Sequence, residues 1–272
     1  MAENSQQQSQ ADLLLYEEKK GVAYITINRP EAKNSLNADI LDRIPSILKV
    51  IAENRKIKVV VIRSTGDRVF SAGLDLKWVT SLGAEALNIV YNKATKVSES
   101  ILKCPKVVIT QIQGAAVGWG TMVFLNSDFR IVADSPDVFF QLPEVDVGIP
   151  AATGATLLPV IHLGIERAKR MLLLREKVGI EFMKDLITKV VPKERLNEET
   201  EEFAKEIAKH PNNHLIQLTK ASINIMGQNL VQRFFEVEKD VLDYAKSAEK
   251  PGIVEYNLEL WKKFANFGPL FP

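Results

Sequence analysis

The sequence predicts an α/β protein with a largely parallel, helix-covered sheet followed by a helical C-terminal region. Two observations support this prediction. Strand-like and helix-like patterns alternate over the first two-thirds of the chain, and after about residue 165 the strand signals fade and helical patterns dominate. Such an alternation is typical of parallel sheets, in which a helix crosses from one strand to the next. With 272 residues, of which 46% are apolar and 25% charged, the chain can bury a substantial core.

Four runs rich in β-branched or aromatic residues predict buried strands, at residues 22–27, 59–62, 107–112 and 129–132. Turn residues at 28–30 end the first of these strands. Apolar residues at helical spacing predict helices at 37–54 and 85–102. Asn37 is suited to cap the first helix, because its side chain can accept a hydrogen bond from an N–H group of the first turn.

Helical patterns fill the rest of the chain, at residues 166–174, 179–186, 198–209, 215–226, 231–248 and 254–264. Such a tail can fold over the core or dock on a neighbouring subunit. We expect a disordered lead-in at 1–11, because this segment is rich in Ser, Gln and Asn. The core is expected at 12–200 and the helical region at 201–272.

The composition argues against several classes of function. The formal net charge is +1 and the pI about 7.7, so the chain as a whole is not expected to bind nucleic acid or membrane. We find no apolar run long enough to span a bilayer and no signal peptide, and we expect a cytoplasmic protein. The single Cys104 is expected to be a buried structural thiol. His162, His210 and His214 lack the spacing of metal ligands, so no metal is expected.

Two glycine-rich turns and one acid are the strongest indications of chemistry. The segments 70–77 (FSAGLDLK) and 113–120 (QGAAVGWG) each follow a predicted strand. Turns of this kind can aim two backbone N–H groups at the same developing negative charge. Glu144 lies among apolar residues in LPEVDVG, an environment that makes a carboxylate a better base. Together these features indicate an enzyme that stabilises an enolate and moves a proton.

Four segments resemble, in order and spacing, the crotonase (enoyl-CoA hydratase/isomerase) family. They are NRPEAKNSLN at 28–37, FSAGLDL at 70–76, QGAAVGWG at 113–120 and LPEVDVG at 142–148. The resemblance covers about residues 15–270. It implies a crotonase-type ββα spiral core, a helical C-terminal region used in trimerisation, and acyl-CoA thioester substrates, usually of fatty-acid β-oxidation. The implied assembly is a homotrimer or a dimer of trimers, and no cofactor is implied beyond the CoA of the substrate.

The resemblance also implies roles for the residues at the centre of the site. Leu74 and Trp119 would supply the two backbone N–H groups of an oxyanion hole, and Glu144 would be the catalytic acid and base. Trp119 stands where the family tends to have a small residue. Its indole therefore either walls the acyl pocket or packs into the core.

CoA recognition is implied for a second group of residues. The loop around Ala32 and Lys33, together with the turn at Ala72, would hold the nucleotide and pantetheine parts of CoA. Lys77 can meet a CoA phosphate or simply face solvent. Asp75 is grouped with these residues by position, but we expect it chiefly to cap a helix or to brace the turn.

Met122 is the main departure from the family pattern. A typical hydratase has one glutamate at this position and a second at the position of Glu144, and a thioether cannot accept a proton at neutral pH. Monofunctional Δ3-Δ2-enoyl-CoA isomerases also lack the first acid, and the segment 128–136 (DFRIVADSP) is similar to theirs. One glutamate suffices for isomerisation, because the base that takes the C2 proton can return it to C4. The resemblance therefore favours an isomerase.

Two alternatives stay open. A hydratase could work with Glu144 alone or recruit Asp146, which would share a face with Glu144 in an extended segment, although we favour a structural role for Asp146. A non-catalytic acyl-CoA binder could have kept the scaffold and lost the chemistry. The dienoyl-CoA isomerases are disfavoured, because their two further aspartates correspond here to Met122 and Ala152.

Overall fold

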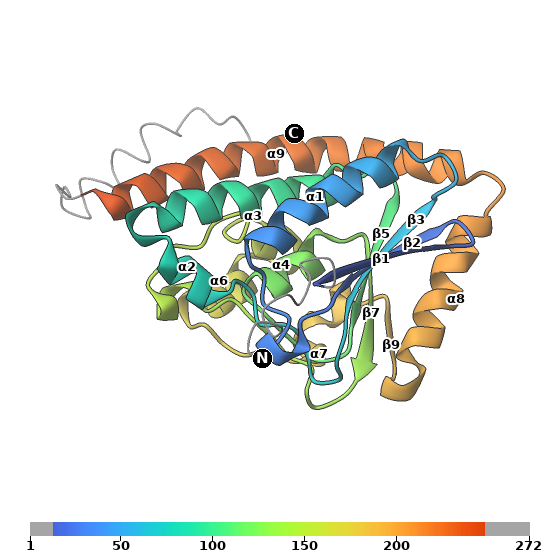
Figure 1. Ribbon diagram of the computed structural model, residues 1–272, viewed down its shortest axis with the longest axis horizontal. Coiled ribbons are helices and arrows are strands. Elements are labelled where there is room, and N and C mark those ends of the chain that lie inside the picture. Colours follow the sequence, from blue (N-terminus) through green and yellow to red (C-terminus); the bar gives the residue numbers. More distant parts are fainter. Residues whose placement is uncertain (1–12, 248–272) are drawn as a thin grey trace, which may run out of the picture.

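The computed structural model describes residues 13–247, without the side chains of 226–228, and its centre is a six-stranded sheet (Figure 1). The strands in spatial order are β1 (Leu14–Lys19), β2 (Val22–Ile27), β3 (Val59–Ser64), β5 (Val107–Ile112), β7 (Phe129–Asp134) and β9 (Lys189–Pro192). Strand β1 runs antiparallel to β2, and the other neighbouring pairs are parallel. The predicted parallel sheet is therefore confirmed.

The strands that were predicted from sequence are the most deeply buried ones. Every residue of β2 and β5 is buried, which is expected where a parallel sheet is covered on both faces. Strand β1 was not predicted, because half of its sequence, LLYEEK, is charged and all but its first residue is exposed.

A second, three-stranded parallel sheet consists of β4 (Val69–Ser71), β6 (Ala115–Val117) and β8 (Phe140–Gln141). Each of these short strands follows a strand of the larger sheet: β4 follows β3, β6 follows β5 and β8 follows β7. The chain thus adds one strand to each sheet before its next helix. This is the ββα spiral that was expected.

Helices cover both faces of the larger sheet (Figure 1). On one side α1 (Ala38–Glu53) packs on α3 (Ala86–Leu102), and α3 packs on α9 (Asn213–Lys246) and on the wholly buried α4 (Trp119–Asn126). On the other side α8 (Leu196–Lys209) contacts several strands. The remaining α-helices of the described chain are α2 (Leu76–Ser81), α5 (Leu158–Leu163), α6 (Ile165–Leu173) and α7 (Ile180–Met183).

The helix boundaries agree with the sequence in most places. Asn37 caps α1 as predicted, since its Oδ1 accepts a hydrogen bond of 3.1 Å from Ile40 N. The separate helices predicted at 215–226 and 231–248 are wrong, because α9 is one continuous helix of 34 residues. The interval between the two predictions contains Gly227, but a glycine inside a helix costs only about 1 kcal/mol, which tertiary packing can offset. The predicted lead-in at 1–11 and helix at 254–264 lie outside the described residues.

Two expectations from composition can be compared with the described chain. Cys104 is buried as predicted, and burial raises the pKa of its thiol. Between residues 13 and 247, no helix combines the length and the apolar character that crossing a membrane requires.

Candidate active site

The two glycine-rich turns lie in direct contact. Gly73 has φ +87°, and a Cβ atom on it would lie only 2.8 Å from the carbonyl oxygen of Val117 and 3.3 Å from Trp119 N. At Gly120 a Cβ atom would lie 2.6 Å from the carbonyl oxygen of Ser71. Only glycine permits so close an approach of two backbones. The contact brings the ends of β4 and β6 together, as the sequence predicted.

The first turn leaves one backbone N–H group free. Gly73 N donates to Ser71 Oγ at 3.1 Å, and Asp75 N donates to the carbonyl oxygen of Leu36 at 2.9 Å. Leu74 N lies between these two donors and has no hydrogen-bond acceptor among the described residues. It is therefore available to a ligand.

The second turn provides a matching donor. Gly118 N donates to the carbonyl oxygen of Gln141 at 2.8 Å, and Gly118 has φ +51°, which turns the chain into α4. Trp119 is the first residue of α4, where a backbone N–H has no partner within the helix. Within residues 13–247 no acceptor binds Trp119 N. The structure thus brings together Leu74 N and Trp119 N, the two predicted donors.

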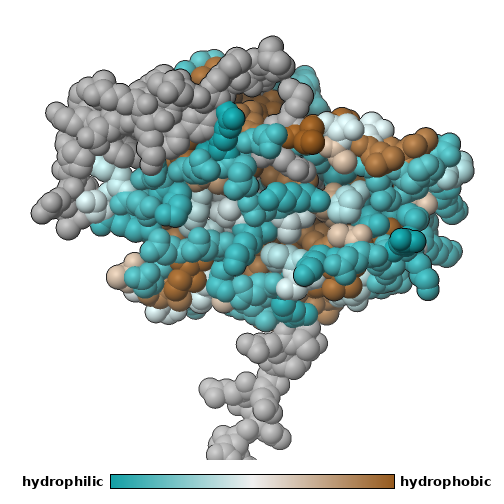
Figure 2. All heavy atoms as spheres, turned by 90° about the horizontal axis from the view of Figure 1, so that it is seen from above, coloured by the Kyte–Doolittle hydropathy of each residue, from teal (hydrophilic) through white to brown (hydrophobic). Residues whose placement is uncertain are grey.

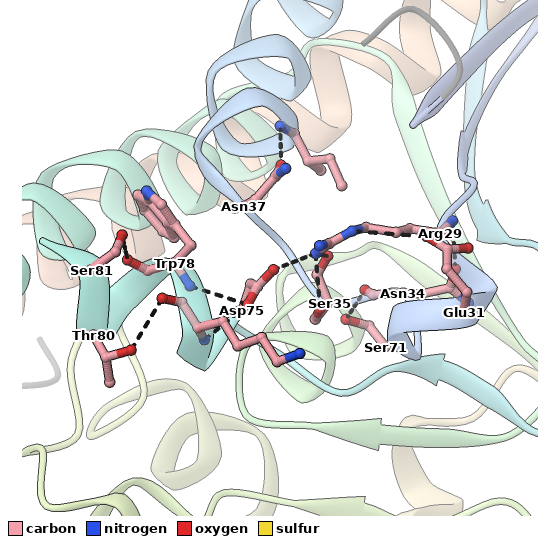
Figure 3. A network of polar contacts seen from close by, with 12 residues as sticks. Arg29, Glu31, Asn34, Ser35, Asn37, Ser71, Asp75, Trp78, Thr80 and Ser81 are labelled. Carbon is pink, nitrogen blue, oxygen red and sulfur yellow. Dashed lines mark hydrogen bonds and ion pairs between the residues drawn. The ribbon is translucent and has the colours of Figure 1, made fainter. Parts of the chain in front are cut away.

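A network of hydrogen bonds and ion pairs holds the first glycine-rich turn in place (Figure 3). The Arg29 guanidinium forms an ion pair of 2.6 Å with Asp75 and donates to Ser35, while Ser71 Oγ donates to the carbonyl oxygen of Asn34 at 2.8 Å. The network therefore joins the segment 29–35 to the turn that carries Leu74.

Asp75 has the capping role that the sequence predicted. Its Oδ1 accepts hydrogen bonds from Lys77 N at 3.0 Å and Trp78 N at 3.2 Å, at the start of α2. Burial acts to raise the pKa of Asp75, but the Arg29 guanidinium and the two N–H groups outweigh burial and hold this pKa below its usual value. Asp75 therefore supports the turn as an ionised side chain.

Weakening this support is expected to reduce both stability and turnover. We expect Asp75→Asn to lower the free energy of unfolding by about 1–3 kcal/mol, because the half-buried Arg29 loses its charged partner. We expect kcat to fall about tenfold, because the neighbouring Leu74 N–H shifts. Urea unfolding and steady-state kinetics measure the two effects. Asp185→Asn is the control, since it removes an exposed ion pair with Arg167 and should change neither quantity. Equal behaviour of the two variants would contradict a supporting role for Asp75.

Glu144 faces the second turn. It begins the 3-10 helix Glu144–Val147, and a Cβ atom on Gly118 would lie 3.7 Å from Glu144 Oε1. Its Oε2 is buried and has no hydrogen-bond partner in the described chain. Burial raises the pKa of Glu144 to about 7, and the negative charge of Glu238 adds to the rise, while the residue's own backbone N–H opposes it. Such a carboxyl can both accept and donate a proton near neutral pH.

A small cavity of about 60 Å³ unites the predicted catalytic residues. Leu74, Trp119, Met122 and Glu144 all line it, and Glu144 is the one carboxylate among its described lining residues. Met122 is buried, so this part of the cavity wall is an apolar thioether. The Trp119 indole is also buried and lines the cavity, so it both packs in the core and walls the pocket. Trp78 packs against the core and is not part of this lining.

The predicted orientation of Asp146 is wrong. The sequence was interpreted as extended at this point, but the chain forms a 3-10 helix, in which residues two apart do not share a face. Asp146 is exposed and forms an ion pair of 2.8 Å with Arg175. It is absent from the described lining of the cavity. Asp146 thus makes its polar contact outside the cavity, and Glu144 has no second carboxylate beside it among the described lining residues.

The residues expected to bind CoA are only partly gathered. Ala72 N donates to the carbonyl oxygen of Lys33 at 3.0 Å, and both residues line a second cavity of about 570 Å³. Ala32 precedes Lys33 on the 3-10 helix Pro30–Ala32 but does not appear in that lining. Lys77 is exposed on α2 and lines neither cavity. The binding roles of these residues stay predictions.

Part of the lining of the small cavity was not predicted from the sequence, because it comes from segments that are distant along the chain. Tyr91 from α3, Thr153 from the segment before α5 and Leu242 from α9 complete the small cavity. Glu238 of α9 lies behind this wall. Its position in a stripe of apolar residues was a signal that could have been noticed. Among the residues that the structure describes, no three His, Cys, Asp or Glu side chains gather as a possible metal site.

Comparisons with known proteins agree with this arrangement. A family model described as enoyl-CoA hydratase/isomerase matches residues 17–265. A crotonyl-CoA hydratase from Syntrophomonas wolfei is 30% identical over 258 residues, which span 93% of this chain and 97% of the relative. A short-chain-enoyl-CoA hydratase from Clostridium acetobutylicum is 29% identical over 213 residues, 76% of this chain and 79% of the relative. The crystal structure of an enoyl-CoA hydratase/isomerase from Xanthobacter autotrophicus superposes with a TM-score of 0.78 at 25% identity, covering 96% of this chain and 98% of that one.

Proposed function

The chain belongs to the enoyl-CoA hydratase/isomerase family of enzymes, and on this basis we propose that it moves the double bond of an enoyl-CoA thioester from Δ3 to Δ2. The observation that carries the proposal is the single carboxylate of the small cavity. Glu144 lines the same cavity as two residues with free backbone N–H groups, Leu74 and Trp119. Met122, where the family resemblance implies the second acid of a hydratase, lines this cavity too. This is the minimum set for a reaction that needs one proton shuttle and one oxyanion site.

The proposed reaction uses Glu144 twice. Its carboxylate removes a proton from C2, and the electrons of the broken C–H bond pass to the thioester oxygen to give a dienolate. Leu74 N–H and Trp119 N–H bind that oxygen, each contributing roughly 3–4 kcal/mol by analogy with other oxyanion holes. The protonated Glu144 then returns the proton to C4, and the double bond comes to rest between C2 and C3. A pKa of about 7 suits both half-reactions.

Hydration of a 2-enoyl-CoA is the second candidate. The relatives from Syntrophomonas wolfei and Clostridium acetobutylicum are both named hydratases, which supports it. Addition of water requires a base for the water and an acid for C2, and Glu144 would have to serve as both. The outward orientation of Asp146 removes the acid that was considered as its helper. We therefore rank hydration below isomerisation.

A non-catalytic acyl-CoA binder is the third candidate and fits the site least well. Two unpaired N–H groups and a buried carboxylate with one unpaired oxygen destabilise a fold unless they serve a ligand. A protein that only held the CoA part would need none of them.

Self-association remains part of the proposal. Figure 2 shows hydrophobic side chains among mainly hydrophilic ones on the face that carries α1, α3 and α9. On the first half of α9 the exposed apolar residues include Leu215, Leu218, Ile223 and Ile225. Exposed apolar side chains of this kind support the trimer, or dimer of trimers, that we expect through the helical C-terminal region.

A paired assay tests the proposed function. One arm offers trans-3-hexenoyl-CoA and follows formation of the conjugated 2-enoyl thioester, and the other offers crotonyl-CoA and follows loss of conjugation. We expect turnover in the first arm to exceed that in the second by at least about a hundredfold, because hydration lacks its second carboxylate. Met122→Leu keeps the volume and removes the sulfur, so it should retain nearly full isomerase activity.

The other outcomes of the assay are equally informative. Fast hydration in the second arm would overturn the isomerase proposal in favour of the hydratase. Binding of both thioesters without turnover in either arm would favour the acyl-CoA binder.

A further inference from the structure

A buried acid interrupts the apolar face of α9. Val231, Phe235 and Leu242 lie at helical spacing, and each is at most 4% exposed. Glu238 occupies the same face and is 1% exposed. A carboxylate withdrawn from water is strongly destabilising unless its oxygens receive hydrogen bonds or a charged partner. The position therefore calls for an explanation beyond the packing of α9.

Within the described chain, the hydrogen bonds that Glu238 accepts come from one short segment, residues 153–156. Gly154 N donates to Oε2 at 2.8 Å, and both the backbone N and the Oγ1 of Thr156 donate to Oε1, at 3.0 and 2.6 Å. Within the described chain no lysine, arginine or histidine forms an ion pair with Glu238. The carboxylate is thus committed to a segment that lies 82–84 residues away in the sequence.

The segment that donates hydrogen bonds to Glu238 also forms part of the wall of the small cavity. Ala152 and Thr153 both line the cavity that holds Glu144. Thr153 is buried and has φ +62°, a conformation that is unfavourable for a β-branched residue and persists only where the surroundings enforce it. Gly154, which follows it, has φ +92°. The backbone of Thr153 and of Gly154 donates to Glu238, and these hydrogen bonds supply that enforcement.

Glu238 also acts on the site through its charge. The groups that face it are Glu144 on the 3-10 helix and Tyr91 on α3, whose hydroxyl donates to the carbonyl oxygen of Phe235 at 2.5 Å. Asp243 on α9 and Glu99 on α3 act on Tyr91 in turn. Burial raises the pKa of Glu238, and the hydrogen bonds from residues 153–156 oppose that rise by favouring the ionised form. Its negative charge adds to the proton affinity of Glu144.

We propose that Glu238 is a positioning residue of the active site, which holds the segment 154–156 so that Thr153 and Ala152 form a fixed wall of the acyl cavity beside Glu144. The proposal rests on the proposed function, because it takes the small cavity as the acyl site. Glu238 itself does not appear among the residues that line the cavity, so it acts through the wall and not by touching the substrate.

Glu238→Gln tests the proposal, because an amide keeps the size of the side chain but replaces one acceptor oxygen by a donor. We expect kcat on trans-3-hexenoyl-CoA to fall about thirtyfold and KM to rise up to about tenfold, because the acyl group loses its fixed wall while the CoA part binds elsewhere. The acid limb of the kcat/KM–pH profile should move to lower pH, since removal of a negative neighbour lowers the proton affinity of Glu144. A purely structural loss would not move this limb.

The matched control is Lys220→Gln. Lys220 is a second buried polar residue of α9, and its Nζ donates to the carbonyl oxygen of Lys106 and to Asp128, away from the cavity. We expect this variant to lose stability while keeping kcat and the pH profile of the wild type. If Glu238→Gln behaves in the same way, the proposal is overturned.

A binding measurement separates this inference from the proposed function. Calorimetry compares the affinities for trans-3-hexenoyl-CoA and for CoA alone, and the ratio reports the acyl cavity whether or not turnover occurs. We expect Glu238→Gln to reduce the ratio about tenfold and Lys220→Gln to leave it unchanged. An unchanged ratio in Glu238→Gln would overturn the inference even if the isomerase activity is established. If Glu238→Gln does not fold, Thr156→Val removes one donor alone, and it must reduce the ratio in the same direction for the proposal to hold.

Discussion

Replacement of Glu144 by glutamine is expected to lower kcat by about a thousandfold or more while the protein remains folded. Glutamine has nearly the same shape but cannot accept a proton, and the described lining of the cavity contains no other carboxylate. In the wild type, kcat/KM should fall about tenfold per pH unit below pH 7, because the pKa of Glu144 is about 7 and only the ionised form is a base. Steady-state kinetics across pH 5–9 checks both statements.

The same substitution is expected to stabilise the protein at high pH. The pKa of Glu144 rises from an ordinary 4.5 to about 7 on folding, so the folded state binds more protons between these values. Protonated Glu144 therefore contributes to the free energy of unfolding, and this contribution is fully present below pH 4.5 and is lost as the pH rises to 7. Glutamine stays neutral, so at pH 8 Glu144→Gln should be more stable than the wild type by about 2 kcal/mol, a figure reduced for partial solvent exposure. At pH 5 the two should be nearly equal in urea unfolding.

Asp146→Asn is the control for Glu144→Gln. Asp146 lies two residues away on the same 3-10 helix, but its exposed side chain pairs with Arg175 outside the cavity. We expect its kcat within about twofold of the wild type and its stability within about 0.5 kcal/mol at either pH. Retention of most turnover by Glu144→Gln would remove Glu144 from its catalytic role, and a large loss in Asp146→Asn would restore the hydratase interpretation.

The parts of the fold that were predicted correctly are those specified by local pattern. Strands β2, β3, β5 and β7 are rich in β-branched and aromatic residues, and the Asn37 side chain can cap a helix by itself. The strands β4, β6 and β8 have only two or three residues, too few for a periodic signal. They form because neighbouring turns of the spiral align them, which is tertiary information.

In the candidate active site, too, the features that depend on local sequence were predicted and those that depend on tertiary packing were not. The two glycine turns and Glu144 are local sequence features, and the structure brings them together. The face that Asp146 occupies depends on whether the chain is extended or helical after Pro143, and the pattern alone did not decide this. The wall of the cavity comes from α3, α9 and the segment around Thr153, whose convergence depends on long-range packing. Glu238 shows that a polar residue in an apolar stripe can reveal such a contact in advance.

Gly73→Ala is expected to have the second largest effect on activity. A Cβ atom at this position would lie 2.8 Å from the carbonyl oxygen of Val117 and 3.3 Å from Trp119 N, so the two turns must move apart. Leu74 N follows Gly73 directly, and a shift of this turn moves one donor away from the other. An oxyanion hole that loses one donor loses about 10²–10³ in kcat. We therefore expect a loss of kcat in that range and only a small change in KM.

Backbone strain alone would also destabilise this variant, and Gly164→Ala separates the two causes. Gly164 has φ +80°, close to the +87° of Gly73, but a Cβ atom there would have no neighbour within 4 Å. Gly164 also has ψ 159°. Both variants should therefore lose stability, because a residue with a Cβ atom is strained at positive φ. Only Gly73→Ala should lose turnover, because only there does the added methyl group separate the two donors. An equal loss of turnover in both variants would mean that strain, and not the spacing of Leu74 N and Trp119 N, limits the reaction.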